Sequence, residues 1–88
     1  MTIKIKTNPI LQQFTNNQDT VEVTGSTIGE CLNNLIRQFP DTKQWLFDKN
    51  GILLALIIIN GETLYQNDRN RPVADGDELQ LITIVGGG

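Results

Sequence analysis

The residues with the clearest chemical potential are Gly86, Gly87 and Gly88, which follow an apolar segment at the end of the sequence. Glycine has no Cβ, so a glycine tail can lie extended in a channel too narrow for other residues. Three residues reach about 10 Å at 3.3–3.6 Å per residue. The carboxylate of Gly88 could therefore be presented to the active site of another enzyme. A frayed terminus is the alternative, because chain ends are commonly disordered.

The rest of the chain offers little catalytic equipment. It contains no histidine and a single cysteine, Cys31. A Ser–His–acid triad, a Cys–His nucleophile pair and a histidine-based zinc site are therefore excluded. An iron–sulfur cluster is excluded too, because it needs four cysteine or equivalent ligands. We expect Cys31 to be a small core residue, since nothing around it predicts the exposed, electropositive setting of a reactive thiol. A substrate or partner protein is favoured over an enzyme.

Composition and charge narrow the class further. A chain of 88 residues with 39% hydrophobic residues is one small domain. A net charge of −3 argues against non-specific binding to nucleic acid or anionic lipid and suits a basic protein surface. No apolar run approaches the roughly 20 residues of a membrane-spanning helix. The first residues lack the apolar block of a signal peptide, and a lone cysteine fits a reducing compartment, so a cytoplasmic location is expected.

The first half of the sequence predicts two strands and a helix. Residues 2–7 alternate polar and apolar, and Val21 and Val23 mark a second strand, so a hairpin with a long loop is expected. Thr27-Ile28-Gly29-Glu30 fits a helix-initiating capping box. The apolar residues that follow have helical spacing, and Pro40 ends the helix. These apolar residues are Ile28, Cys31, Leu32, Leu35, Ile36 and Phe39.

The second half predicts three more strands. After the helix we expect a short helical turn capped by Asp41, with Trp45 and Phe47 at the edge of the core. The isoleucine-rich run over 53–59 is typical of a strand covered on both faces or nearly so. Asn60-Gly61 predicts a tight turn into a short strand, and a polar loop follows it. The expected ranges are 62–65 for that strand, 67–70 for the loop, 75–77 for a final turn and 78–85 for the last strand.

The last strand carries the candidate partner interface. Leu79, Leu81 and Ile84 are candidates for an exposed apolar patch that docks another protein. The alternation slips where Leu81 and Ile82 are adjacent, so the pattern does not separate the core side of the strand from its surface side.

The final third of the chain resembles the ubiquitin-like sulfur carriers. The resemblance rests on Pro72-Val73-Ala74-Asp75-Gly76-Asp77-Glu78-Leu79, followed by a strand and a diglycine ending. The early Thr-Ile-Gly-Glu helix start and the Ile59-Asn60-Gly61-Glu62 turn are also similar to that family. Its members include the small subunit of molybdopterin synthase, the thiamine-biosynthesis sulfur carrier and the carriers that feed cysteine synthesis.

This resemblance implies a β-grasp fold, an α+β architecture in which one main helix packs on one face of a mixed sheet of about five strands. The first and last strands should lie side by side at the sheet centre. Residues 1–85 would form the domain and residues 86–88 a flexible tail. The implied chemistry is adenylation of Gly88 by an E1-like adenylyltransferase that uses ATP and magnesium, with Gly86 and Gly87 in its channel. A sulfur donor would then form a thiocarboxylate for a sulfur-accepting biosynthetic enzyme, while the carrier itself binds no cofactor.

The pathway and the mode of transfer stay open. The segment 82–85 lacks the proline common in molybdopterin and cysteine carriers, and the Val-Gly-Gly-Gly ending is closer to thiamine carriers. The length and the insertion over 41–51 are closer to the molybdopterin and cysteine types. A protein modifier joined to lysines through Gly88 is one alternative. A non-covalent interaction module, in which the glycines have no role, is the other.

Overall fold

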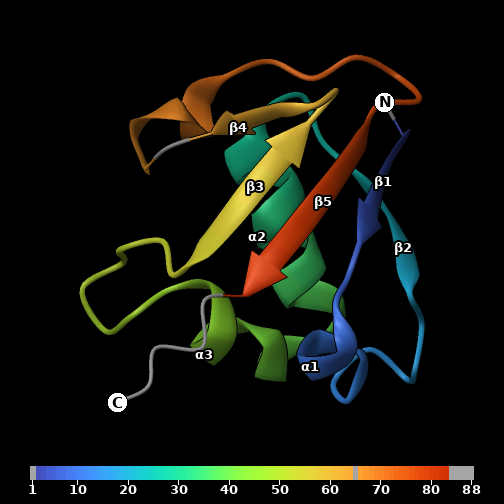
Figure 1. The fold of residues 1–88 in the computed structure, drawn as a ribbon, viewed down its shortest axis with the longest axis vertical. Helices are drawn as coiled ribbons and strands as arrows, with labels where there is room; N and C mark the ends of the chain where they lie inside the picture. The colour runs from blue at the N-terminus through green and yellow to red at the C-terminus, as the bar shows by residue number, and fades with distance from the viewer. Residues whose placement is uncertain (1, 65, 84–88) are drawn as a thin grey trace.

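A computed structural model describes residues 2–64 and 66–83. Five strands form one mixed sheet in the order β2-β1-β5-β3-β4, and the principal helix, α2, lies across one face of it (Figure 1). The central strands β1 and β5 are parallel, and the other neighbouring pairs are antiparallel. The bounds are β1 Thr2–Lys6, β2 Thr20–Thr24, α2 Ile28–Gln38, β3 Ala55–Ile59, β4 Glu62–Leu64 and β5 Glu78–Thr83. The expected α+β architecture is confirmed.

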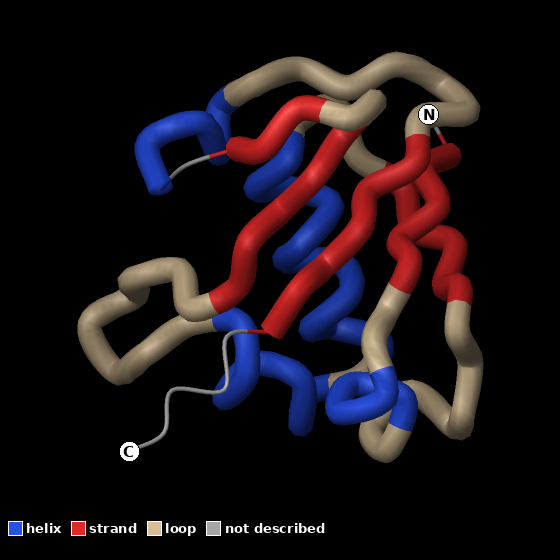
Figure 2. The backbone as a smooth tube through the Cα atoms, viewed as in Figure 1, coloured by secondary structure: helices blue, strands red, loops and turns tan. Residues whose placement is uncertain are grey.

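The core lies between α2 and the face of the sheet that the helix covers. The alternation read from the sequence decides which side chains enter it, because successive residues of a strand point to opposite faces. Ile3 and Ile5 of β1 and Val21 and Val23 of β2 are buried, as predicted. From α2, the buried residues are Ile28, Cys31, Leu32 and Leu35. Figure 2 shows that none of the helices in the described residues crosses the opposite face of the sheet, which we call the open face.

The capping box fixes the start of α2. The Thr27 hydroxyl accepts a hydrogen bond from the Glu30 amide at 3.2 Å. The Glu30 carboxylate reaches back to the Ser26 amide at 2.8 Å, one residue further than expected. These bonds satisfy amides that a helix leaves unpaired at its start. The helix therefore begins where the sequence predicted and is followed at Pro40 by a tighter 3-10 turn.

Two turns fix the register of the strands. Asn60 and Gly61 both have positive φ, 51° and 80°, the geometry of a two-residue hairpin turn. In the Asp75–Asp77 turn, the Asp75 carboxylate accepts from the Thr2 amide at 2.7 Å. The Asp77 carbonyl accepts from the Lys4 amide at 3.0 Å. The second turn thus joins the start of β1 to the start of β5, a structural role that the sequence predicted only as a turn.

Among the described residues, short helices occupy two segments that were predicted as loops, and also the segment after α2, where a short helical turn was predicted. They are α1 Pro9–Gln12, η1 Pro40–Thr42, α3 Lys43–Leu46 and η2 Gln66–Asn70. The Asn8 side chain caps α1 by accepting from the Leu11 amide at 2.9 Å. The prediction that Asp41 caps the second helical turn is wrong, because Asp41 lies inside that turn, which starts at Pro40 with Phe39 at its N-cap position and has no side-chain cap. Trp45 and Phe47 pack against the core edge, as predicted.

Candidate functional site

Strand β5 positions the candidate site. It lies at the sheet centre between β1 and β3, so it is hydrogen-bonded on both edges. Its last residue, Thr83, is paired with Ala55 at the start of β3. The predicted tail residues Gly86, Gly87 and Gly88 and the predicted interface residue Ile84 lie outside the described residues. The described chain thus ends on a strand that is paired on both sides.

Burial removes two residues from the predicted partner interface. Leu79 and Leu81 are 0% and 1% exposed and belong to the core between the sheet and α2. Their side chains cannot meet another protein without unfolding this one. The physical reason is the strand alternation, which directs Ile82, and not Leu81, to the open face. The sequence placed both neighbours in an apolar run and so concealed the face on which each lies.

The open face carries an apolar strip beside the end of β5. Leu56 of β3 is paired with Ile82 of β5, and Ile58 lies two residues further along β3 on the same face. Ile82 is 38% exposed, whereas Leu56 and Ile58 are half-buried. We call Leu56, Ile58 and Ile82 the open-face strip. Among the described residues, the other exposed large hydrophobic side chains are Ile52 and Leu54, in the loop before β3.

The other half of the open face is charged. Lys4 of β1 is paired with Glu22 of β2 and with Glu78 of β5. The Lys6 ammonium lies 4.0 Å from the Glu78 carboxylate, and both side chains are about half exposed. Exposed pairs of this kind contribute little stability, because water and salt screen them. The face is thus divided into a charged region over β1 and β2 and an apolar region over β3 and the end of β5.

A surface hollow of about 450 Å³ borders the end of β5. Its lining comes from the segment after β1 and from β5, and consists of Thr7, Asn8, Pro9, Ile10, Gln80, Leu81 and Ile82. The side-chain amide of Asn8 donates to the Leu81 carbonyl at 3.4 Å and so links the start of α1 to β5. This hollow adjoins the open-face strip through Ile82. Both lie beside the C-terminal part of β5.

The described residues bring together no catalytic grouping. Burial, with a smaller contribution from the Glu30 charge, raises the pKa of the Cys31 thiol, which disfavours the reactive thiolate. In the described chain, no three histidine, cysteine, aspartate or glutamate residues are placed to hold a metal ion. None of its helices is long and apolar enough to cross a bilayer.

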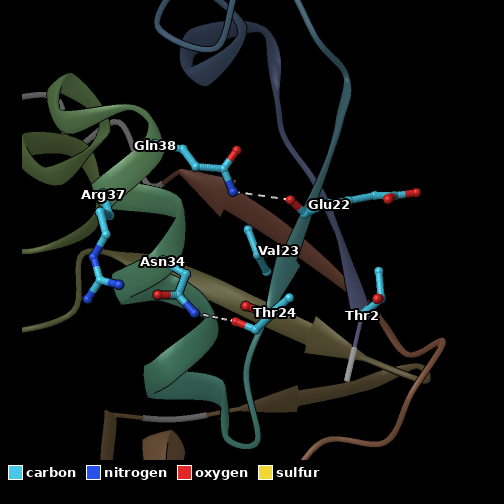
Figure 3. A pocket seen from close by; sticks show the side chains of 7 residues that line it. All are labelled: Thr2, Glu22, Val23, Thr24, Asn34, Arg37 and Gln38. Carbon is cyan, nitrogen blue, oxygen red and sulfur yellow. Dashed lines mark hydrogen bonds between the residues drawn. The ribbon is translucent and has the colours of Figure 1, made fainter.

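A second hollow, of about 370 Å³, lies between α2 and β2 (Figure 3). Asn34 and Gln38 project from α2 across it and donate to the carbonyls of Thr24 and Glu22, the second bond at 3.2 Å. Both side-chain amides are therefore occupied in holding the helix to the strand. This hollow holds no nucleophile next to a base, and we assign it no chemistry.

The model of the ThiS family matches residues 5–88 of the chain. A search of curated protein sequences found no match. Because the family match covers nearly the whole chain, it includes β5, the open-face strip and the terminal glycines.

Solved structures share the fold. The Haloferax volcanii small archaeal modifier protein 1 is 26% identical, with a TM-score of 0.81 over 96% of this chain and 98% of that one. CysO in the Amycolatopsis orientalis BexX/CysO complex structure is 24% identical, with a TM-score of 0.83 over 98% and 99%. A chain in the complex of subunits 1 and 2 of the Helicobacter pylori molybdopterin-converting factor is 22% identical. Its TM-score is 0.64, and the match covers 100% of this chain and 100% of that one. These similarities confirm the β-grasp fold.

Proposed function

The chain belongs to the ThiS family of small ubiquitin-like sulfur carriers, and on this premise we propose that it carries sulfur as a thiocarboxylate on Gly88. Members of this family are carriers or non-catalytic subunits, and the chain is accordingly a carrier and not an enzyme. The observation that carries the proposal is the family match, which extends through the terminal glycines.

The proposed chemistry starts from an inert carboxylate. An α-carboxyl group has a pKa of about 3.3–3.7, so at neutral pH it is an anion and a poor electrophile. Attack of this carboxylate on ATP forms an acyl–AMP bond and releases pyrophosphate, with an E1-like adenylyltransferase and magnesium supplying the catalysis. A donor then delivers sulfur at the oxidation level of sulfide. The new C–S bond replaces the C–O bond to AMP, AMP departs, and a thiocarboxylate remains on Gly88.

The fold supports this division of labour. β5 is held between two neighbours, and the Asp75–Asp77 turn ties its start to β1, so we expect the domain to stay folded when the tail is removed. The open-face strip of Leu56, Ile58 and Ile82 takes the interface role that was predicted for Leu79 and Leu81. It lies beside the end of β5, where an enzyme receiving Gly88 would approach. The solved complexes of CysO and of the molybdopterin-converting factor support a protein partner of this kind.

An intact-mass measurement tests the proposal. The purified chain is incubated with the E1-like adenylyltransferase of its source organism, ATP, magnesium and a sulfide-level donor. We expect the mass to rise by the difference between one sulfur and one oxygen atom. A variant that lacks Gly87 and Gly88 serves as the control and should not change. Absence of the shift, with an enzyme shown to be active on another carrier, would refute the proposal.

A second candidate function is protein modification. The Haloferax volcanii modifier protein is more similar in sequence, at 26% identity, than the two carrier complexes described above, at 24% and 22%. A modifier would use the same acyl-adenylate, but a lysine amine would replace AMP and form an isopeptide bond. Isolation of tagged chain from its source organism distinguishes the two functions. Lysine-linked conjugates ending in Gly88 would establish modification, and their absence would leave the carrier function alone.

A further inference from the structure

The loop over 47–54, which connects α3 to β3, exposes apolar side chains from a well-defined backbone. Ile52 is 50% exposed and Leu54 is 36% exposed. Figure 1 shows this loop projecting beside the C-terminal end of β5. Large apolar side chains exposed next to one another commonly mark an interaction site. The question is whether this loop is held in place or merely frayed.

Hydrogen bonds inside the loop hold it in place. The Asp48 carboxylate accepts from the amides of Asn50 at 2.8 Å and Ile52 at 2.9 Å. The Asp48 amide donates to the Ile52 carbonyl at 2.9 Å, and the Gly51 amide donates to the Asp48 carbonyl at 3.0 Å. Gly51 has φ of 79°, a conformation that favours glycine. The backbone of Ile52 is therefore bonded on both its amide and its carbonyl.

Arg69 of η2 fastens the loop from outside. Its guanidinium carbon lies 5.3 Å from the centre of the Phe47 ring, within the range of a cation–π contact. The same guanidinium donates to the Gly51 carbonyl at 3.4 Å. At the other end of the loop, the Leu54 amide donates to the Leu46 carbonyl at 2.7 Å. The loop is thus fixed to α3 and to η2, and Ile52 stays exposed in a fixed place.

The short tail brings any enzyme that receives Gly88 close to this loop. Five residues follow Thr83, and at 3.3–3.6 Å each they span at most about 18 Å. An enzyme that receives Gly88 must therefore stand within about 18 Å of Thr83. Thr83 is paired with Ala55, the neighbour of Leu54, so the loop lies directly beside the root of the tail. An enzyme that approaches this closely on the β3 side of β5 would contact the loop or the open-face strip next to it.

We propose that the loop over 47–54 is a docking platform for the enzyme that activates Gly88, an inference that rests on the proposed function. Ile52 and Leu54 enter an apolar surface of that enzyme, and the exposed Lys49 meets a carboxylate at its border. Arg69 is a positioning residue: it holds the platform in shape and acts through Phe47 and Gly51. The platform extends the open-face strip and would decide which activating enzyme accepts this carrier.

Steady-state kinetics of adenylation test the platform. The E1-like adenylyltransferase of the source organism is assayed by pyrophosphate release, with ATP saturating and the carrier varied. For an I52S/L54S variant we expect KM for the carrier to rise at least about tenfold, because two buried apolar contacts are lost. The kcat should stay nearly unchanged, since Gly88 itself is untouched. The conservative I52L variant should keep the wild-type KM.

The role of Arg69 has its own readout. In an R69A variant, amide hydrogen exchange at Ile52 should speed up and KM should rise by a smaller factor than in I52S/L54S. The matched control is R37A, which removes an exposed arginine of α2 that lines the hollow between α2 and β2. Unchanged exchange at Ile52 in R69A would overturn the positioning role. Melting curves that match wild type establish that each variant is folded.

The outcomes separate this inference from the function beneath it. If the wild-type chain releases no pyrophosphate with the enzyme, the proposed function fails. If the wild-type chain is adenylated and I52S/L54S has a KM within about twofold of it, the platform is refuted while the carrier function stands.

Discussion

The β2 edge of the sheet and the end of β5 differ in what they leave exposed: β2 has its outward carbonyls bonded, whereas apolar side chains near the end of β5 are exposed. At β2, two outward carbonyls are occupied by the amides of Asn34 and Gln38. Near the end of β5, by contrast, Ile82 is exposed to water, and so are Ile52 and Leu54 in the loop before β3. An open strand edge invites pairing with another chain, and natural proteins cover or charge such edges. We therefore expect the two amides to disfavour strand pairing at the β2 edge, whereas apolar surface stays exposed beside the end of β5.

Adjacent residues of β5 give the largest expected difference. Leu81 is buried and Ile82 is exposed, so one strand contains both sides of the comparison. We expect Leu81→Ala to lower the free energy of unfolding by about 2–5 kcal/mol, because it leaves a cavity in the core. Ile82→Ala should cost about 1 kcal/mol or less. Urea unfolding of both variants checks this. Equal losses would mean that the two faces of the strand are not distinct.

The amide pair at β2 gives a smaller effect. In an N34A/Q38A variant, loss of both hydrogen bonds should lower the free energy of unfolding by about 1–3 kcal/mol, because each bond contributes about 0.5–1.5 kcal/mol. The carbonyls of β2 would also become free to pair, so self-association should increase at high protein concentration.

The matched control for the amide pair is N33A, which removes an exposed amide from the same helix. It should change neither stability nor association. Urea unfolding and sedimentation measure the two effects. A double variant that stays monomeric and as stable as N33A would show that the amide pair does not guard this edge.

The smallest expected effect is on the pH dependence of the free energy of unfolding, and it comes from Cys31. This effect tests whether the core between α2 and β2 excludes solvent. Gly25, between β2 and α2, packs against Cys31: a Cβ atom added to Gly25 would lie 2.9 Å from the Cys31 sulfur. Burial raises the pKa of this thiol in the folded chain, so above about pH 8.5 the unfolded chain releases the proton first. The stability from this group is complete below that pH and is lost as the pH rises through the folded pKa.

The comparison for Cys31 is the free energy of unfolding from pH 7 to pH 10 in wild type and in C31A. Other groups titrate in both proteins, so the difference between the two slopes isolates the thiol. Wild type should lose more stability than C31A as the pH rises. Identical slopes would mean that the thiol is open to solvent.

Local patterns predicted much of the fold and little of the surface. The capping box at Thr27 and the Asn60-Gly61 turn are encoded by adjacent residues, so the sequence gives them directly. The side on which Leu81 lies depends on the register of β5 against β3, which no local pattern carries. The loop over 47–54 depends on Arg69, a contact between segments far apart in the sequence. The short helices α1 and η2 were missed because four or five residues are too few to show a helical period, whereas the helical turn after Pro40 was predicted and only its cap was wrong.

The most direct test of the account is the position of the sulfur atom after the reaction. The chain that has been treated with adenylyltransferase, ATP, magnesium and sulfur donor is digested, and the peptide that contains Gly88 is fragmented in a mass spectrometer. The account predicts that one oxygen is replaced by sulfur and that the replacement lies on the Gly88 carboxyl group. Sulfur found on Cys31 instead, or a reacted protein whose Gly88 still carries both oxygens, would contradict it.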